Sequence, residues 1–188
     1  MNKPILIIVA CCIACAIAAC FKKINKELAQ SRNVSQQLGE QLKSKLIDAM
    51  QAGGPENALL ICKHEAIKVS TENSKQNNLE VGRTSLKLRN FSNQADDWEI
   101  KQLTWFKSQK LAGSDIKSLE VNEITEENGK NIFRYMKAIP IQEPCLVCHG
   151  KTLAPSIEAK IKNLYPQDQA TGYELGEIRG AFTVKLDL

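Results

Sequence analysis

Aromatic side chains are scarce in this chain, at 5% of 188 residues, and no run of like charge occurs in it. The formal net charge is only +4. Domains that bind nucleic acid usually carry a clustered basic face, so this composition argues against nucleic acid as a partner. The sequence also has no internal repeat and no low-complexity segment. Its length suits one domain of ordinary size.

The body of the chain has too few cysteines for a disulfide framework. Four of the seven cysteines lie within the first 20 residues, and the other three are Cys62, Cys145 and Cys148. An odd number of cysteines cannot all pair within one body. Histidine is scarcer still, with only His64 and His149. Thiol and imidazole ligands for a metal are therefore limited to these few side chains.

Apolar residues are concentrated at the N-terminus, where residues 5–20 contain no charged side chain and have lysines on both sides. Such a segment is typical of a secretory signal, and it is short for a spanning helix, which needs about 20 residues. It ends in Ile-Ala-Ala-Cys20, which resembles the bacterial lipobox. Residues 1–20 are therefore interpreted as a signal peptide with a lipobox or as an uncleaved membrane anchor. Both predict attachment to the membrane with the body on the periplasmic side.

Helical patterns dominate the first half of the body. Apolar residues recur at steps of three and four over residues 24–52, which predicts a long amphipathic helix. The many polar residues in its first half predict that residues 21–52 project as a helical stalk. Gly53-Gly54-Pro55 should end this helix. A second helix is predicted over residues 56–69, and residues 70–80 are predicted to form a loop.

The second half indicates an antiparallel sheet with helical insertions. The Asn128-Gly129 pair is a strong signal for a β-hairpin, and the last strand alternates as if only one face were buried. The predicted elements are a short strand over 81–89, a turn over 90–97, a helix over 98–111 with Asp97 as N-cap, strands over 118–126 and 131–139, a helix over 155–164 and a strand over 178–188. Helices followed by an antiparallel meander indicate an α+β fold.

One motif carries recognisable chemistry. The stretch from Cys145 to His149 reads C-x-x-C-H, the spacing of c-type haem attachment. Two thiols at this spacing can each bond to one vinyl group of a porphyrin, and the next imidazole can bind the iron. The motif predicts one covalent haem c per chain, held by Cys145 and Cys148, with His149 as the proximal ligand. A zinc site, a redox C-x-x-C pair and a structural disulfide are the alternatives.

The second axial ligand of the iron is open on these grounds alone. On a helical wheel, Cys62 falls in the apolar sector of its predicted helix, and His64 falls toward the polar side. Buried free cysteines are commonly small hydrophobic residues without further function. Cys62, His64 and Met136 therefore all remain candidates.

Several stretches together resemble one family of exported c-type haem proteins, described from cyanobacteria and common in proteobacteria. Its members have a PAS-like domain and His/Cys axial ligation. The stretches that carry the resemblance are V-G-R-T-S-L-K-L-R-N at 81–90, W-E at 98–99, P-C-L-V-C-H-G at 144–150 and G-E-I-R-G-A-F at 176–182.

The resemblance implies that His149 and Cys62 bind the iron and that residues 53–188 form a PAS-like domain. It also implies a redox or gas sensor or an electron-transfer module rather than an enzyme, with a separate redox or signalling partner. Arg83, Lys87 and Arg89 offer cations to the haem propionates, although a solvated basic strand face would have the same composition. The remaining alternatives are a structural or zinc-binding lipoprotein and a thiol or peroxide redox enzyme.

Overall fold

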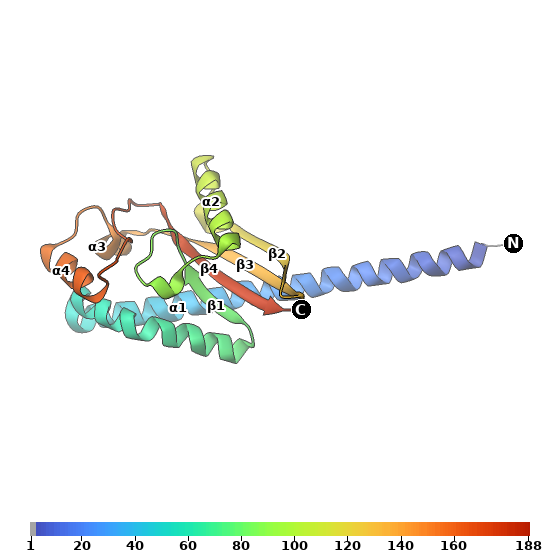
Figure 1. Ribbon diagram of the computed structural model, residues 1–188, viewed down its shortest axis with the longest axis horizontal. Coiled ribbons are helices and arrows are strands. Elements are labelled where there is room, and N and C mark those ends of the chain that lie inside the picture. The colour runs from blue at the N-terminus through green and yellow to red at the C-terminus, as the bar shows by residue number, and fades with distance from the viewer. Residues whose placement is uncertain (1–2) are drawn as a thin grey trace.

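The computed structural model describes the backbone of residues 3–188 and the side chains of residues 22–188. The fold is α+β, with a long N-terminal helix and a four-stranded antiparallel sheet in the order β1-β4-β3-β2 (Figure 1). The strands are β1 (Glu80–Thr84), β2 (Glu120–Glu127), β3 (Lys130–Pro140) and β4 (Ile178–Asp187). The α-helices are α1 (Lys3–Asn77), α2 (Asp97–Leu111), α3 (Leu146–His149) and α4 (Pro155–Leu164), with 3₁₀ turns η1 (Phe91–Asn93), η2 (Ile116–Ser118) and η3 (Glu143–Cys145).

Helix α1 is a hairpin of two arms, because its backbone leaves helical geometry at Gly53 and Gly54. Gly54 has φ +69°, a left-handed conformation that glycine adopts without the steric cost of a Cβ. The Asn57 side chain donates to the carbonyl of Ala49 across the reversal, at 3.0 Å. The first arm (residues 3–52) and the second arm (residues 55–77) therefore run back along each other, as Figure 1 shows.

The predicted loop over residues 70–80 is wrong, because the second arm stays helical to Asn77. Its polar side chains hydrogen-bond to the helix backbone and do not interrupt the helix. They donate to carbonyls one turn earlier, in the case of Ser70, Thr71, Asn73, Ser74 and Asn77. Asn78, with φ +51°, ends the helix.

The predicted stalk is helical but does not project over its described length. Val34 and Leu38 are fully buried, and they pack with Phe133 of β3 and Val184 of β4. Packing of the first arm on the sheet begins at Ile24. The first arm thus covers one face of the sheet and belongs to the folded body.

Helix α2 covers the opposite face of the sheet. Its Leu103 and Phe106 pack with Met136 of β3 and Ala181 of β4. Ala181 and Val184 on opposite faces of β4 are both fully buried, so the prediction that this strand has one buried face is wrong. The alternation of residues along β4 does not indicate that α2 and the first arm cover both of its faces.

Two local signals in the sequence work as expected, with one shift. Asn128 and Gly129 have φ of +53° and +75°, and they join β2 to β3 in the predicted hairpin. Helix α2 begins one residue earlier than predicted, because the N-cap is Asp96 rather than Asp97. Asp96 and Glu99 form a reciprocal capping box, which satisfies two free backbone N–H groups.

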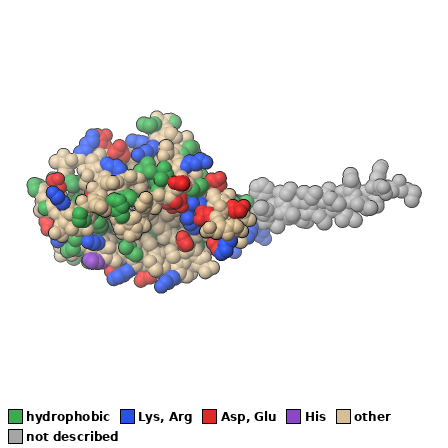
Figure 2. All heavy atoms as spheres, in the orientation of Figure 1, with side chains coloured by type: hydrophobic (Ala, Val, Ile, Leu, Met, Phe, Trp, Pro, Cys, Tyr) green, Lys and Arg blue, Asp and Glu red, His purple; other side chains and the backbone are tan. Residues whose placement is uncertain are grey.

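On the face that Figure 2 shows, charges of both signs are mixed with apolar side chains. Among the described residues, no helix contains a stretch both long and apolar enough to cross a membrane. The predicted signal, lipobox or anchor at residues 1–20, with Cys20, lies outside the side chains that the structure describes.

A buried arginine ties α2 to the sheet. The Arg134 side chain on β3 is 4% exposed and forms ion pairs with Asp96 at 2.7 Å and Glu127 at 3.1 Å. Glu99, also buried, lies 3.6 Å away, and the guanidinium stacks over the ring of Trp98. The charge is thus compensated on several sides by groups from α2 and β2.

Replacing Arg134 by methionine should destabilise the protein by about 3 kcal/mol, the lower end for a broken buried pair. It leaves the buried Glu99 carboxylate without its cation, whereas Asp96 and Glu127 are partly solvated. Chemical denaturation of the variant measures this loss. The control is Lys130→Met, which removes an exposed ion pair with Asp187 and should cost less than about 1 kcal/mol. Equal losses in the two variants would show that the Arg134 cluster does not anchor α2.

Candidate functional site

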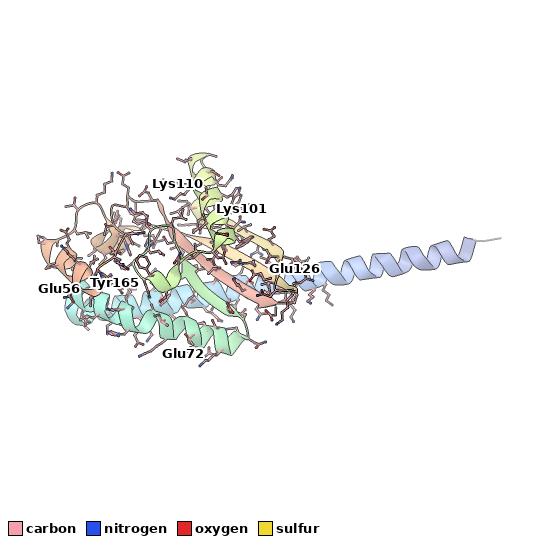
Figure 3. The ribbon with its side chains drawn as sticks, viewed as in Figure 1. Glu56, Glu72, Lys101, Lys110, Glu126 and Tyr165 are labelled. Atoms are coloured by element: carbon pink, nitrogen blue, oxygen red, sulfur yellow. The ribbon has the colours of Figure 1, made fainter. Side chains whose placement is uncertain are left out.

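The C-x-x-C-H motif lies at the end of the sheet where α3, α4 and the tip of the α1 hairpin meet (Figure 1). Figure 3 places Glu56 and Tyr165 at this end and Glu126 at the other. Cys145 ends η3, and α3 contains the rest of the motif up to His149. β3 and β4 pair with each other in the sheet, and the segment that contains α3 and α4 connects them along the sequence. This connection leaves the sheet at the end of β3 and places the motif there.

The motif is held by the loop that returns from α4 to β4. Backbone N–H groups of Gly172 and Tyr173 donate to the carbonyls of Gly150 and His149, at 3.0 and 2.9 Å. Position 150 has no room for a side chain, since a Cβ there would lie 2.6 Å from the carbonyl oxygen of Leu146. A glycine directly after the histidine therefore lets α3 end in the required turn.

His149 is a neutral imidazole with a defined tautomer. Its Nδ1 lies 2.6 Å from the carbonyl oxygen of Ala170. A carbonyl can only accept, so Nδ1 carries the proton and the lone pair of Nε2 is free. Burial, with help from Arg89 and Arg179, lowers the pKa of His149 to about 2. A neutral imidazole whose far nitrogen is fixed by a carbonyl is the usual form of a metal-binding histidine.

Cys148 of the motif faces the second arm of α1. Cys145 and Cys148 are half-buried and are not joined in a disulfide. Cys148 packs against a cluster formed by Leu59 of the second arm and two isoleucines of α4. Burial raises the pKa of Cys148, and the Cys62 thiol adds to this rise. The second arm thus places Cys62 close enough to the motif to affect the pKa of Cys148.

Cys62 and His64 point in different directions on this arm. Cys62 is half-buried and His64 is exposed, as the helical wheel predicts. Burial raises the pKa of the Cys62 thiol, while Arg83 and Arg89 partly oppose that rise. Met136 is fully buried in the core between the sheet and α2, so it is a packing residue there.

Two alternative uses of the motif find no matching geometry. Over the residues that the structure describes, no three His, Cys, Asp or Glu side chains are grouped so as to hold a metal ion by themselves. A closed structural zinc site needs four such ligands. A disulfide between Cys145 and Cys148 is likewise not formed.

The Arg89 guanidinium is hydrogen-bonded to protein groups and is largely shielded from solvent. It forms a two-pronged ion pair with Asp168, at 2.9 and 3.2 Å, and the two side chains are 10% and 7% exposed. It also donates to the carbonyl of Cys148 at 2.6 Å. Arg89 thus has partners within the protein that the sequence does not predict.

Arg83 is a half-buried cation that pairs with no described side chain. Burial is the main cause that lowers its pKa, and Arg179 adds repulsion. No hydrogen bond or ion pair among the described side chains involves it, whereas Arg179 donates to the Ser85 hydroxyl at 2.9 Å and to the Lys87 carbonyl at 3.1 Å. A buried charge is costly unless it is paired, so this arrangement suits an anionic group beside Arg83 and Arg179.

Sequence reasoning missed Arg179 and Asp168. Arg179 lies in the G-E-I-R-G-A-F stretch, but a lone arginine in a strand gives no sign that it turns toward the motif. Asp168 lies in a loop, and nothing in the sequence pairs it with Arg89, which is 79 residues away. The sequence separation hides both contacts until the fold is known.

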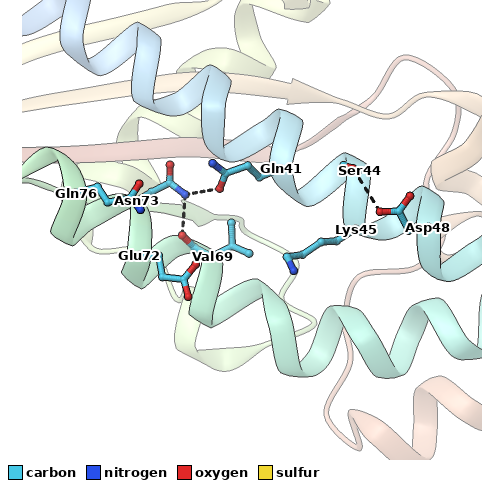
Figure 4. A pocket seen from close by; sticks show the side chains of 8 residues that line it. All are labelled: Gln41, Ser44, Lys45, Asp48, Val69, Glu72, Asn73 and Gln76. Carbon is cyan, nitrogen blue, oxygen red and sulfur yellow. Dashed lines mark hydrogen bonds between the residues drawn. The ribbon is translucent and has the colours of Figure 1, made fainter.

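A polar groove lies elsewhere on the body. It has a volume of about 420 Å³ and runs between the two arms of α1, lined by polar residues such as Gln41, Lys45 and Asn73 (Figure 4). Asn73 donates across it to Gln41, at 2.7 Å. A smaller hollow of about 310 Å³ adjoins the motif at Leu146, Gly150 and Tyr173. Only the smaller one touches the cysteine motif.

Residues 17–186 match the Tll0287-like family, described as Tll0287. The match covers most of the chain, and the chain belongs to this family. One solved structure resembles it, the crystal structure of the cyanobacterial heme-protein Tll0287, with a TM-score of 0.59 and 24% identity over 80% of this chain and 91% of that one. This likeness shows a shared fold. No protein among those with curated function matches the chain.

Proposed function

We propose that the protein is a monohaem c-type protein with a PAS-like domain, and that it acts as a redox or gas sensor or an electron-transfer module rather than as an enzyme. The observation that carries this proposal is the state of His149. Its Nδ1–H is bonded to Ala170 and its Nε2 is free, directly after two unpaired thiols at haem-attachment spacing. The similar solved structure is described as a heme-protein, which supports the same cofactor here.

The residues around the motif fit a haem. Cys145 and Cys148 would form the two thioether bonds, and His149 would supply the proximal nitrogen. Arg83 and Arg179 would meet the anionic propionates, which gives Arg83 the partner that it lacks in the protein. The apolar cluster of Leu59, Ile157 and Ile161 would keep water from one side of the ring.

Cys62 is proposed as the distal ligand. When bound, haem takes up and releases one electron. Burial keeps the free Cys62 thiol protonated, but a coordinated metal ion lowers the pKa of a thiol. The resulting thiolate donates charge and stabilises ferric iron, whereas a methionine ligand would raise the potential. The protein should therefore have a low reduction potential and no open coordination site.

The proposed location is the periplasmic side of a membrane, with attachment through the N-terminus. The apolar segment at residues 5–20 and the lipobox-like sequence before Cys20 support it. The type of cofactor supports it too, because haem of this type is attached outside the cytoplasm. The redox or signalling partner would then be a separate extracytoplasmic protein.

Covalent attachment predicts that the protein keeps its haem after denaturation and acid extraction. Mass spectrometry of protein made in a host that matures c-type cytochromes should show the mass of the chain plus one haem. Cys145→Ala/Cys148→Ala should lose the haem under the same extraction. Detection of the apoprotein mass for the unmodified sequence would contradict the proposal.

Ligation by Cys62 predicts a low-spin, six-coordinate ferric spectrum. Cys62→Ala should give high-spin or water-bound iron and a higher reduction potential, because the charge-donating thiolate is lost. Cys62→His should restore low-spin iron at a potential above that of the wild type. His64→Ala is the matched control on the same arm and should leave the absorption spectrum unchanged. Loss of the six-coordinate spectrum in His64→Ala instead would assign the ligand to His64.

Attachment through a lipid predicts that residues 1–19 are removed and that Cys20 carries acyl chains. Mass spectrometry of the N-terminal peptide from membranes should detect them, and Cys20→Ala should block the processing. An unchanged size in Cys20→Ala, with the protein still in the membrane fraction, would favour the uncleaved anchor over the lipoprotein.

A further inference from the structure

The contacts of Arg89 and Asp168 lead to His149 through the two backbone groups of Ala170. Both side chains are almost completely buried. The Asp168 carboxylate accepts from the Ala170 backbone N–H at 3.2 Å, and the Ala170 carbonyl accepts from His149 Nδ1–H at 2.6 Å. Asp168 therefore holds the peptide group before the Cα of Ala170, and Arg89 contacts the carbonyl after it, at 3.4 Å. Together they restrain the residue on whose carbonyl the orientation of the imidazole depends.

The same arginine also holds the motif itself. Arg89 donates to the Cys148 carbonyl at 2.6 Å and makes a longer contact to the Ala170 carbonyl at 3.4 Å. One guanidinium thus joins the last turn of α3 to the loop that accepts from His149. Neither the Arg89 nor the Asp168 side chain contacts the histidine ring in any hydrogen bond, so both act through the backbone.

We propose that Arg89 and Asp168 are positioning residues that hold the Ala170 carbonyl against His149 and thereby set the reduction potential of the site. This inference rests on the proposed haem function. Groups that bond to the far nitrogen of a metal-binding histidine raise its basicity as a ligand. A shorter, fixed Nδ1–H bond makes the imidazole a better donor and favours ferric iron. Loosening the Ala170 carbonyl should therefore raise the potential.

Charge and positioning have to be separated, because the pair also carries two opposite charges near the iron. Asp168→Asn leaves the Arg89 cation uncompensated, which favours the reduced state, and it loosens Ala170. Both effects raise the potential. The double variant Arg89→Gln/Asp168→Asn removes both charges together, so only the loss of positioning remains.

The experiment measures the reduction potential and the low-spin EPR g-values of purified haem-loaded protein. Asp168→Asn should change the reduction equilibrium about tenfold, or about 59 mV for one electron. The double variant should shift it in the same direction by about threefold, with altered g-values. Arg89→Lys keeps the charge but not the two-pronged geometry, and its g-values should also change.

The control is Lys151→Gln, which removes an ion pair with Glu174 close to the motif, where both side chains are 63% exposed. Its potential and g-values should equal those of the wild type. A double variant that behaves like the wild type would show that only charge matters and would overturn the positioning role. If Arg89 variants fail to load haem, the g-values of Asp168→Asn decide, and unchanged g-values there overturn the positioning role. A wild-type protein without haem would instead refute the proposed function, and this inference with it.

Discussion

The reversal of α1 at Gly53 and Gly54 is the constraint on which the rest of the structure depends. It lets one helix do two things. The first arm covers a face of the sheet through Val34 and Leu38, and the second arm carries Cys62 to the C-x-x-C-H motif. Without the reversal, the sheet would expose an apolar face and the motif would have no thiol opposite it. The fold and the proposed iron site therefore have a common origin in two residues.

The arginines that are shielded from solvent fall into two groups. Arg134 is compensated by carboxylates from α2 and β2, and Arg89 is compensated by Asp168. Both cations are neutralised by carboxylates of the protein, and both ion-pair clusters join separate segments of the chain. Arg83 differs, because no described side chain pairs with it. Arg179 likewise donates only to a hydroxyl and a backbone carbonyl, and both cations act electrostatically on His149. This contrast with Arg134 and Arg89 is the main electrostatic support for an anionic ligand near the motif.

Local features could be predicted from the sequence, and features that depend on distant partners could not. The helix over 155–164 and the hairpin at Asn128-Gly129 follow from short-range rules of capping and turn geometry, and they agree with the structure. Residues 70–77 are predicted wrongly as a loop, because Ser and Asn side chains can hydrogen-bond to backbone carbonyls within a helix as well as in turns. The C-x-x-C-H motif is contiguous in the sequence and can be recognised there. The contacts from Asp168 to His149 join segments that only the folded chain brings together.

The arrangement of α1 also separates the two ends of the molecule. A helix rises 1.5 Å per residue, so the stretch from Lys22 to Gly53 spans roughly 46 Å, and the return to Cys62 covers roughly 13 Å of it. The cysteine motif thus lies tens of ångströms beyond the point where the described side chains begin. A molecule that approaches α3 and α4 would meet the exposed tip of the body, clear of whatever surrounds the N-terminal segment. The hairpin therefore works as a spacer as well as a cover for the sheet.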